Sequence, residues 1–358
     1  MTGARRRLYL AVLRRSAEPS RWLHRFAWFL ALATLFLICS GGMVTSKNAG
    51  LAVPDWPTTF GYNMFFFPIS KWIGGIFFEH VHRLIASTVG FLTIILAVWL
   101  WRAESRRWLR ILGLVALGAV ILQGILGGLR VTMLKDEIGI FHACLAQAFF
   151  GLLVFIAVAT SRFWMQGRPR SMPALLVWLP LATTILIYGQ LALGATMRHQ
   201  HRDLSILDFP LAYGQVLPDT SPARIAAINQ WRDARAFSDV TAAQIWLQIA
   251  HRFGALLVAV GVIGFWLAQR RLSEREFILE RLAGLWVLCV LGQIGLGAWT
   301  IWSNKAADIA TAHVALGATI LALGISISAF TLRLRSPESI AAREARSPAP
   351  AREGVHAS

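Results

Sequence analysis

Apolar and polar residues follow one another along the chain in long blocks. Eight blocks are apolar over about 20 residues, the length of α-helix that crosses the hydrocarbon core of a bilayer. Polar stretches separate them, and two of these stretches are long. The pattern predicts an all-α integral membrane protein with eight transmembrane helices, near residues 26–45, 79–101, 109–129, 138–161, 173–196, 245–268, 281–302 and 308–331.

The composition agrees with lipid as the natural solvent. Of the 358 residues 56% are hydrophobic and only 15% are charged, and the mean hydropathy is +0.57. A soluble protein of this length cannot bury so much apolar surface. The net charge of +17 could indicate a nucleic-acid partner. The basic residues lie between the apolar blocks, however, where they orient a membrane protein, so we expect lipid and no nucleic acid around the chain.

Basic residues also predict the topology. The tails and the loops on one side, together with the adjoining first residues of two spans, carry 23 Lys and Arg residues, and the loops on the other side carry 10. This bias predicts a multi-pass protein of the inner (plasma) membrane with both termini in the cytoplasm. The block at 26–45 follows arginines as a signal peptide would, but no small-residue cleavage site follows it, so we expect it to be retained. We expect a basic cytoplasmic tail at 1–25, a cytoplasmic linker at 162–172 and a disordered tail at 332–358.

The two parts of the chain that this linker separates, 26–161 and 173–331, resemble each other. The second span begins VHRLIASTVG and the sixth begins AHRFGALLVA; His251 follows His82 by 169 residues, and His313 follows His142 by 171. Each part holds four spans, so both copies cross the membrane in the same direction. The sequence therefore predicts two tandem four-helix bundles related by internal duplication. Further matched features are Glu137 with Asp308, Gln123 with Gln293, Gly127 with Gly297, and the outer-loop segments LAVPDWP and SILDFPLAYG.

The repeat separates the two histidines of EHVHR, residues 79–83. His82 corresponds to His251, whereas His80 corresponds to Ile249. Glu79 corresponds to Gln248, so a carboxylate precedes only the first of the repeated histidines. A charged group in an apolar setting is costly unless it is paired or protonated. This asymmetry suggests that one half reacts and that the other half serves it.

Four histidines at matched positions suggest two sites, each with two imidazoles from different helices. A single intramembrane histidine is more often a packed, hydrogen-bonded residue than a ligand, but four in a repeat favour ligation. Paired imidazoles suit the axial positions of a haem. Zinc would need a third ligand that the second half does not offer, and a proton relay would need further carboxylates. We interpret His82, His142, His251 and His313 as ligands of haem iron.

Other residues fit a haem site less specifically. Arg83 and Arg252 directly follow two of the histidines, and each could pair with haem propionates or reach the headgroup region by snorkelling. His199 and His201 in the fifth-to-sixth outer loop could bind a metal or simply be solvated. Small residues near the histidines would admit a flat macrocycle or ordinary helix packing: Gly124, Gly127, Gly128, Gly295, Gly297, Ala143, Ala315 and Gly317.

Over nearly all of 26–331 the chain resembles the haem A synthase (CtaA/Cox15) family. GGMVTSKNAGLAVPDWP, EHVHR, His142, His251-Arg252 and His313 carry this resemblance. It implies an oxidoreductase that converts the C8 methyl group of haem O to a formyl group, by way of the alcohol, to give haem A for terminal oxidases. It also implies that His82 and His142 hold haem O, that His251 and His313 hold haem b as cofactor, and that Glu79 is catalytic.

One position departs from the family pattern. Many members carry a cysteine pair in the first outer loop, with one cysteine directly before PDWP, where this chain has Val53. Any thiol role in that loop is therefore absent. The three cysteines, Cys39, Cys144 and Cys289, lie inside apolar blocks, and we expect them to be inert.

Two other functions stay open on the sequence. The first is a bis-histidine b-type electron-transfer cytochrome that acts with quinol, although such proteins commonly place two ligands on one helix. The second is a haem transporter or chaperone. Glu79 favours catalysis over both, since neither needs it. The expected partners are haem O, haem O synthase, an electron donor and membrane lipid, with a homo-oligomer left open.

Overall fold

The computed structural model describes residues 20–166, 172–200, 203–271 and 276–335. Eight of its helices are long and apolar enough to cross a membrane. These are α2 (Arg21–Ser46), α3 (Gly74–Ala103), α4 (Arg107–Met133), α5 (Asp136–Ala159), α7 (Ala174–His199), α9 (Ala242–Arg270), α10 (Phe277–Trp302) and α11 (Ala307–Leu334). The shorter ones are η1 (Met64–Phe66), η2 (Ile69–Lys71), α6 (Arg162–Gln166) and α8 (Pro222–Asp233).

The eight predicted spans are confirmed, and the described residues contain no strand beyond two isolated β-bridges. Most helices extend a few residues beyond the predicted apolar block. Helix α3, for example, begins at Gly74 and not near residue 79. Polar residues at the end of a membrane helix can stay helical in the headgroup region, although they end the apolar block from which the span was predicted. The predicted tails at 1–25 and 332–358 lie largely outside the described residues, and α6 occupies the start of the predicted linker.

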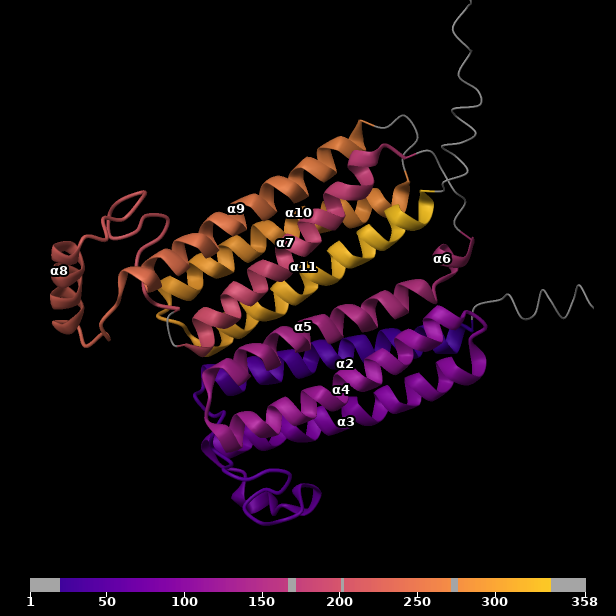
Figure 1. The fold of residues 1–358 in the computed structure, drawn as a ribbon, viewed down its shortest axis with the longest axis horizontal. Helices are drawn as coiled ribbons and strands as arrows, with labels where there is room; N and C mark the ends of the chain where they lie inside the picture. Colours follow the sequence, from indigo (N-terminus) through magenta and orange to yellow (C-terminus); the bar gives the residue numbers. More distant parts are fainter. Residues whose placement is uncertain (1–19, 167–171, 201–202, 272–275, 336–358) are drawn as a thin grey trace, which may run out of the picture.

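The helices form two four-helix bundles with the same internal arrangement (Figure 1). In the first, α2 packs on α3, α3 on α4, α4 on α5 and α5 on α2. In the second, α7, α9, α10 and α11 repeat this ring in the same order. The bundles meet where α11 packs on α2 and α5, and where α5 packs on α7. The arrangement is the one that duplication of a four-span unit would give.

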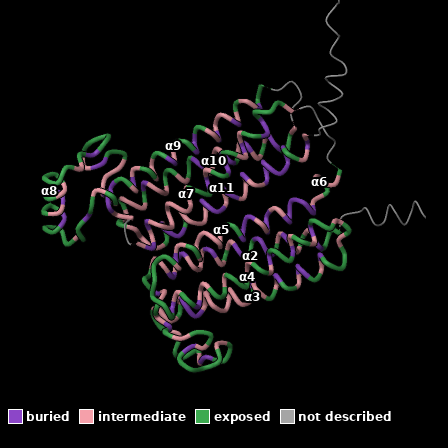
Figure 2. Tube along the Cα trace, viewed as in Figure 1, coloured by how far each residue is buried: buried purple, intermediate pink, exposed green. Residues whose placement is uncertain are grey.

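Burial is distributed as a membrane requires (Figure 2). Each bundle has its own apolar core, one around Leu30, Leu96 and Leu153 and the other around Phe265 and Trp286. Large apolar side chains also cover the outer faces of the helices. Among these, Phe91 is 63% exposed and Leu288 is 67% exposed. Exposed apolar surface on this scale is favourable only against lipid.

Two long loops, loop 1 (residues 47–73) and loop 2 (residues 203–241), lie at the same end of the two bundles (Figure 1). Each contains one turn held by an aspartate. Asp55 accepts hydrogen bonds from the backbone N–H groups of Phe60 and Gly61 at 2.7 and 2.9 Å. Asp208 accepts the equivalent bonds from Tyr213 and Gly214 at the same two distances. The glycines have φ of +76° and +80°, a backbone conformation that favours glycine.

The hydrogen bonds stabilise the charged form of the loop 1 aspartate. Burial opposes ionisation, but the bonds from Gly61, from the Thr58 hydroxyl and from Phe60 outweigh it and lower the pKa of Asp55. A lowered pKa means that this carboxylate stabilises the folded loop above its unfolded pKa, and that the contribution is lost as pH falls through the folded value. Loop 1 is therefore held by an ionised Asp55 at neutral pH.

Candidate haem-binding site

The structure brings the four predicted histidines together in two pairs. His82 lies on α3 and His142 on α5, and the two imidazoles are close enough to interact electrostatically. His251 on α9 and His313 on α11 form the equivalent pair in the second bundle. Each pair comes from two helices of one bundle, near the end that carries loops 1 and 2. Imidazoles on two different helices could bind one flat group from both of its faces.

A glycine on the neighbouring helix lies against each of the four rings. A Cβ on Gly41 would stand 3.1 Å from Cε1 of His82, and one on Gly194 would stand 3.4 Å from Cε1 of His251. Gly41 and Gly194 were not among the small residues predicted from the sequence. The other two follow the same pattern: Gly127 lies against His142 at 3.4 Å and Gly297 against His313 at 3.2 Å. Aligning the first span with the fifth would have found Gly41 and Gly194, since both stand at the same place in α2 and α7.

The other predicted small residues have different surroundings. Gly124 and Gly295 face open space, with no atom within 4 Å of a Cβ built on either. Gly128 lies against the indole ring of Trp56 in loop 1, and Gly317 lies against Gln293 and Leu191. Of the six predicted glycines, only Gly127 and Gly297 therefore lie against a histidine ring.

The imidazoles have the bonding capacity that a haem-binding residue needs. The Nδ1 atom of each of the four rings is buried and has no hydrogen-bond partner in the described structure, while each residue as a whole is half-buried. Gln123 and Gln293 fix the local backbone, because each donates a 3.0 Å hydrogen bond to the carbonyl oxygen of His142 or His313. Buried polar atoms normally have partners. Unmet capacity at four equivalent positions fits residues that bind a further group, and paired imidazoles fit haem.

Replacing Gly297 with alanine is expected to disturb the second pair selectively. The new methyl group would stand 3.2 Å from Cε1 of His313, so the ring must move by a few tenths of an ångström. We expect a shifted absorption or electron paramagnetic resonance spectrum of the bound haem in this variant. Gly295→Ala is the matched control, because it adds the same methyl group to α10 in open space and gains the same helix propensity. Identical spectra for the two variants would contradict the role of Gly297 in positioning the His313 ring.

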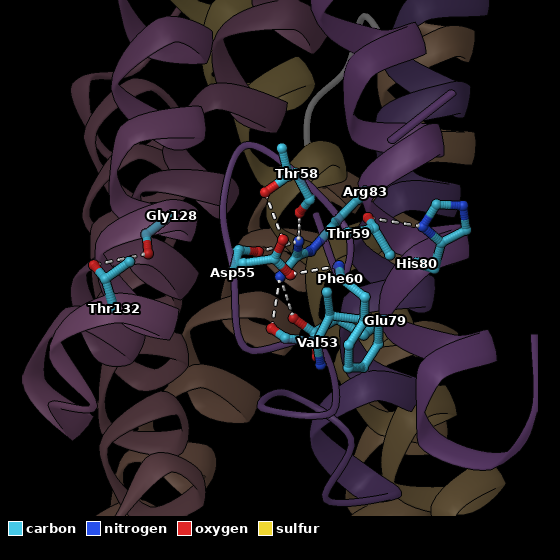
Figure 3. A network of polar contacts seen from close by, with 10 residues as sticks. All are labelled: Val53, Asp55, Thr58, Thr59, Phe60, Glu79, His80, Arg83, Gly128 and Thr132. Carbon is cyan, nitrogen blue, oxygen red and sulfur yellow. Dashed lines mark hydrogen bonds and ion pairs between the residues drawn. The ribbon is translucent and has the colours of Figure 1, made fainter. Parts of the chain in front are cut away.

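Arg83 and Glu79 hold loop 1 onto α3 (Figure 3). Arg83 donates from Nη1 to the carbonyl oxygens of Asp55 and Thr58, at 2.7 and 3.0 Å, and from Nη2 to that of Val53 at 3.0 Å. Nη2 also forms a 2.7 Å ion pair with Oε1 of Glu79. The other carboxylate oxygen, Oε2, accepts a 2.9 Å hydrogen bond from the N–H of Val53. Both side chains are thus built into the anchor of loop 1.

The second bundle holds loop 2 in the same way. Arg252 donates to the carbonyl oxygens of Asp208, Pro210 and Leu211. Gln248 makes a pair of bonds with Ile206, accepting from its N–H at 2.7 Å and donating to its carbonyl oxygen at 3.4 Å. A glutamine therefore performs the anchoring that Glu79 performs in the first bundle. What Glu79 adds is a negative charge, buried to 4% exposure beside the first histidine pair.

His80 has a separate environment in the cap that loop 1 forms. It is fully buried between Phe67 and Trp72, with ring centroids 5.1 and 4.8 Å from its own. Its Nδ1 atom lies 3.3 Å from the hydroxyl oxygen of Thr59. His80 thus packs into loop 1, away from the repeated pair, as its lack of a repeat partner suggested.

We expect His80→Ala to be much milder than His82→Ala in haem A formation. Loss of the His80 ring removes packing in loop 1 and costs on the order of 2–3 kcal/mol of stability. Loss of His82 removes one of the two imidazoles of the first pair. Thermal unfolding and pigment analysis of the two variants separate these effects. Equal losses of haem A in both would overturn the distinction drawn from the repeat.

Of the two histidines predicted in the loop between the fifth and sixth spans, the structure describes only His199. His199 is the last residue of α7, and it is buried against Gly139 of α5, so it does not belong to a solvated loop. His201 falls outside the described residues. No group of three His, Cys, Asp or Glu side chains in the described chain could hold a metal ion. The three cysteines are free and half-buried.

The neighbouring Arg198 and Gln190 were also missed from sequence. From α7, Arg198 reaches the first bundle, where it donates to the carbonyl oxygen of Gly42 at 2.7 Å and to the Ser46 hydroxyl. Gln190 donates a 2.5 Å hydrogen bond to the carbonyl oxygen of His251. The corresponding residues of the first half are Thr45 and Leu37, so neither the charge of Arg198 nor the amide group of Gln190 is repeated, and the repeat gave no signal for them.

Comparison with known proteins places the whole site in one family. The family model of COX15-CtaA, described as cytochrome oxidase assembly protein, matches residues 24–325. Similar curated proteins are named "Heme A synthase". The one from Shouchella clausii is 26% identical over 293 residues, which cover 79% of this chain and 88% of that protein. Those from Halalkalibacterium halodurans and Shewanella oneidensis are 26% and 24% identical, covering 82% and 86% of this chain and 91% and 96% of theirs.

Proposed function

The chain belongs to the COX15-CtaA family of cytochrome oxidase assembly proteins, and on this premise we propose that it is a haem A synthase. It is a membrane oxidoreductase that converts the C8 methyl group of haem O to the formyl group of haem A. The observation that carries this proposal is the pair of equivalent bis-histidine sites, of which only the first has a buried carboxylate, Glu79. One site reacts and the other delivers electrons to it.

In this proposal the first pair, His82 and His142, holds the substrate haem O, and the second pair, His251 and His313, holds haem b. Bound haem b supplies one-electron transfer. The protein orients both groups through the ring positions that Gly41, Gly127, Gly194 and Gly297 allow. Glutamine contacts to the carbonyl oxygens of His142, His251 and His313 fix three of the four backbones.

Glu79 places a negative charge next to the substrate pair. It keeps this charge because Arg83 and the N–H of Val53 bind its two oxygens. A fixed charge helps only if it acts on charge that develops during oxidation of the methyl group. Arg83 and Arg252 remain candidate partners of haem propionates. Most of the hydrogen bonds that their guanidinium groups donate go to carbonyl oxygens of loops 1 and 2.

A quinol-dependent cytochrome or a haem carrier would use the same histidine pairs. Neither needs the halves to differ in charge. The difference between Glu79 and Gln248 favours catalysis, since both residues hold their loops and only one carries a charge.

We place the protein in the plasma membrane with both termini in the cytoplasm, on the strength of the Lys and Arg distribution. Loops 1 and 2 then face outward, and the histidine pairs lie in the outer half of the bilayer. Haem O synthase is the expected supplier of substrate. An electron donor is a further expected partner, and a homo-oligomeric assembly stays open.

Pigment analysis of the purified protein tests this function. Haem O and haem A bound alongside haem b are the expected result, and added haem O should yield haem A under reducing, aerobic conditions. Haem b alone, with no conversion of added haem O, would instead support the electron-transfer cytochrome.

A further inference from the structure

Arg130 differs from the other arginines near the histidine pairs. Arg83, Arg198 and Arg252 each donate three or more hydrogen bonds, mainly to backbone carbonyl oxygens. The guanidinium group of Arg130 makes no hydrogen bond or ion pair with any of the described residues. A cation at this depth in a membrane protein is costly unless an anion or polar groups accompany it.

Arg130 is directed into the first bundle. It lies in the last turns of α4, three residues after Gly127, whose backbone contacts the ring of His142. Glycines on two sides make room for the guanidinium group. A Cβ built on Gly50 would stand 3.0 Å from Nη2 of Arg130, and one built on Gly139 would stand 3.3 Å from its Nε. Its charge acts on both imidazoles of the first pair and on the carboxylates of Glu79 and Asp136, neither of which forms an ion pair with it in the described structure.

This charge has no counterpart in the second bundle. Aligning α4 with α10 through Gln123 and Gln293 places Thr300 opposite Arg130. The Thr300 hydroxyl donates a 2.8 Å hydrogen bond to the carbonyl oxygen of Leu296, within its own helix. Among the residues that the structure describes, only the half assigned to the substrate therefore offers a cation without an ion-pair partner beside its histidines.

We propose that Arg130 binds a propionate carboxylate of the tetrapyrrole held between His82 and His142, an inference that rests on the proposed function. Two axial imidazoles leave a flat macrocycle free to rotate in its own plane. A guanidinium that pairs with one carboxylate at the rim stops this rotation, because its planar fork matches the two carboxylate oxygens. Arg130 is thus a positioning residue that decides which edge of the substrate, and so which methyl group, faces Glu79.

The test compares haem O with its dimethyl ester, in which both propionates are uncharged. Binding of each is measured to full-length protein in detergent, for the unchanged protein, Arg130→Leu, Arg130→Lys and the control Arg107→Leu. The control removes one exposed arginine from the other end of the same helix. We expect the unchanged protein and Arg107→Leu to prefer the free acid by about tenfold or more, as a charge-assisted pair gives. Arg130→Leu should lose most of this preference, with any remainder due to Arg83, and Arg130→Lys should retain more of it than Arg130→Leu.

Each ratio is measured within one variant, so a general loss of active protein does not change it. Arg130→Leu that keeps the full preference for the free acid would overturn the proposal. So would an equal weakening of acid and ester, which is the result expected if Arg130 binds a lipid phosphate. Failure of the proposed function would look different: the unchanged protein would bind neither form at the first pair and would convert no haem O.

Discussion

Replacing His251 or His313 with alanine is expected to remove the haem b that we propose the second pair holds, and to leave the helices folded. Each imidazole supplies one axial bond, and alanine supplies none, so the low-spin bis-histidine spectrum should disappear in either variant. We expect haem b per protein to fall at least about tenfold, which corresponds to a loss of about 1.4 kcal/mol or more in binding. Absorption spectra and haem extraction from the purified variants measure this.

His24→Ala is the matched control for these two variants. His24 is also on a membrane helix, but it lies near the other end of the bundle and bonds to the carbonyl oxygen of Ala157 at 2.9 Å. Its removal should leave the haem content unchanged. An intact low-spin haem b after His251→Ala or His313→Ala would remove both residues from the assignment and place the cofactor elsewhere.

The repeat explains why so much of this site could be predicted from sequence. Lipid leaves a chain few options beyond helices of about 20 apolar residues, so the spans follow from hydropathy alone. Duplication then supplies an internal comparison. It distinguished His82 from His80, and the structure places His80 in the cap of loop 1, apart from the pair. Residues that repeat could be predicted because they perform the same task twice.

Residues that differ between the halves were harder to predict. Arg130 ended an apolar count and was assigned to an outer loop, yet it lies within α4 and is directed inward. The direction of a long side chain depends on which neighbouring residues leave room for it. For Arg130 these are Gly50 in loop 1 and Gly139 on α5, and neither belongs to its own helix. The loop contacts of Arg83 depend on the path of loop 1, which no periodicity describes.

Glu79 also differs between the halves. Glu79→Gln is expected to give a protein that keeps both haems but does not complete the oxidation of haem O. Glutamine can hold loop 1, because Gln248 holds loop 2 through the same backbone groups. It cannot supply the negative charge. If that charge acts on the oxidised methyl group, cells that make the variant should accumulate haem O or the alcohol intermediate, with haem A reduced by about a hundredfold.

Glu79→Ala completes the argument, because it removes the charge and the anchor together. A purely anchoring role predicts that glutamine works nearly as well as glutamate and that alanine fails, with loop 1 detached from Val53 and Arg83. A catalytic role predicts that both variants stall, and that only alanine also lowers thermal stability. The structure argues against a third role, orientation of the His82 ring, because Nδ1 of His82 has no hydrogen-bond partner in the described structure and the carboxylate oxygens of Glu79 bind Arg83 and Val53. Near-normal haem A in cells with Glu79→Gln would therefore leave Glu79 as an anchor and end its assignment as a catalytic residue.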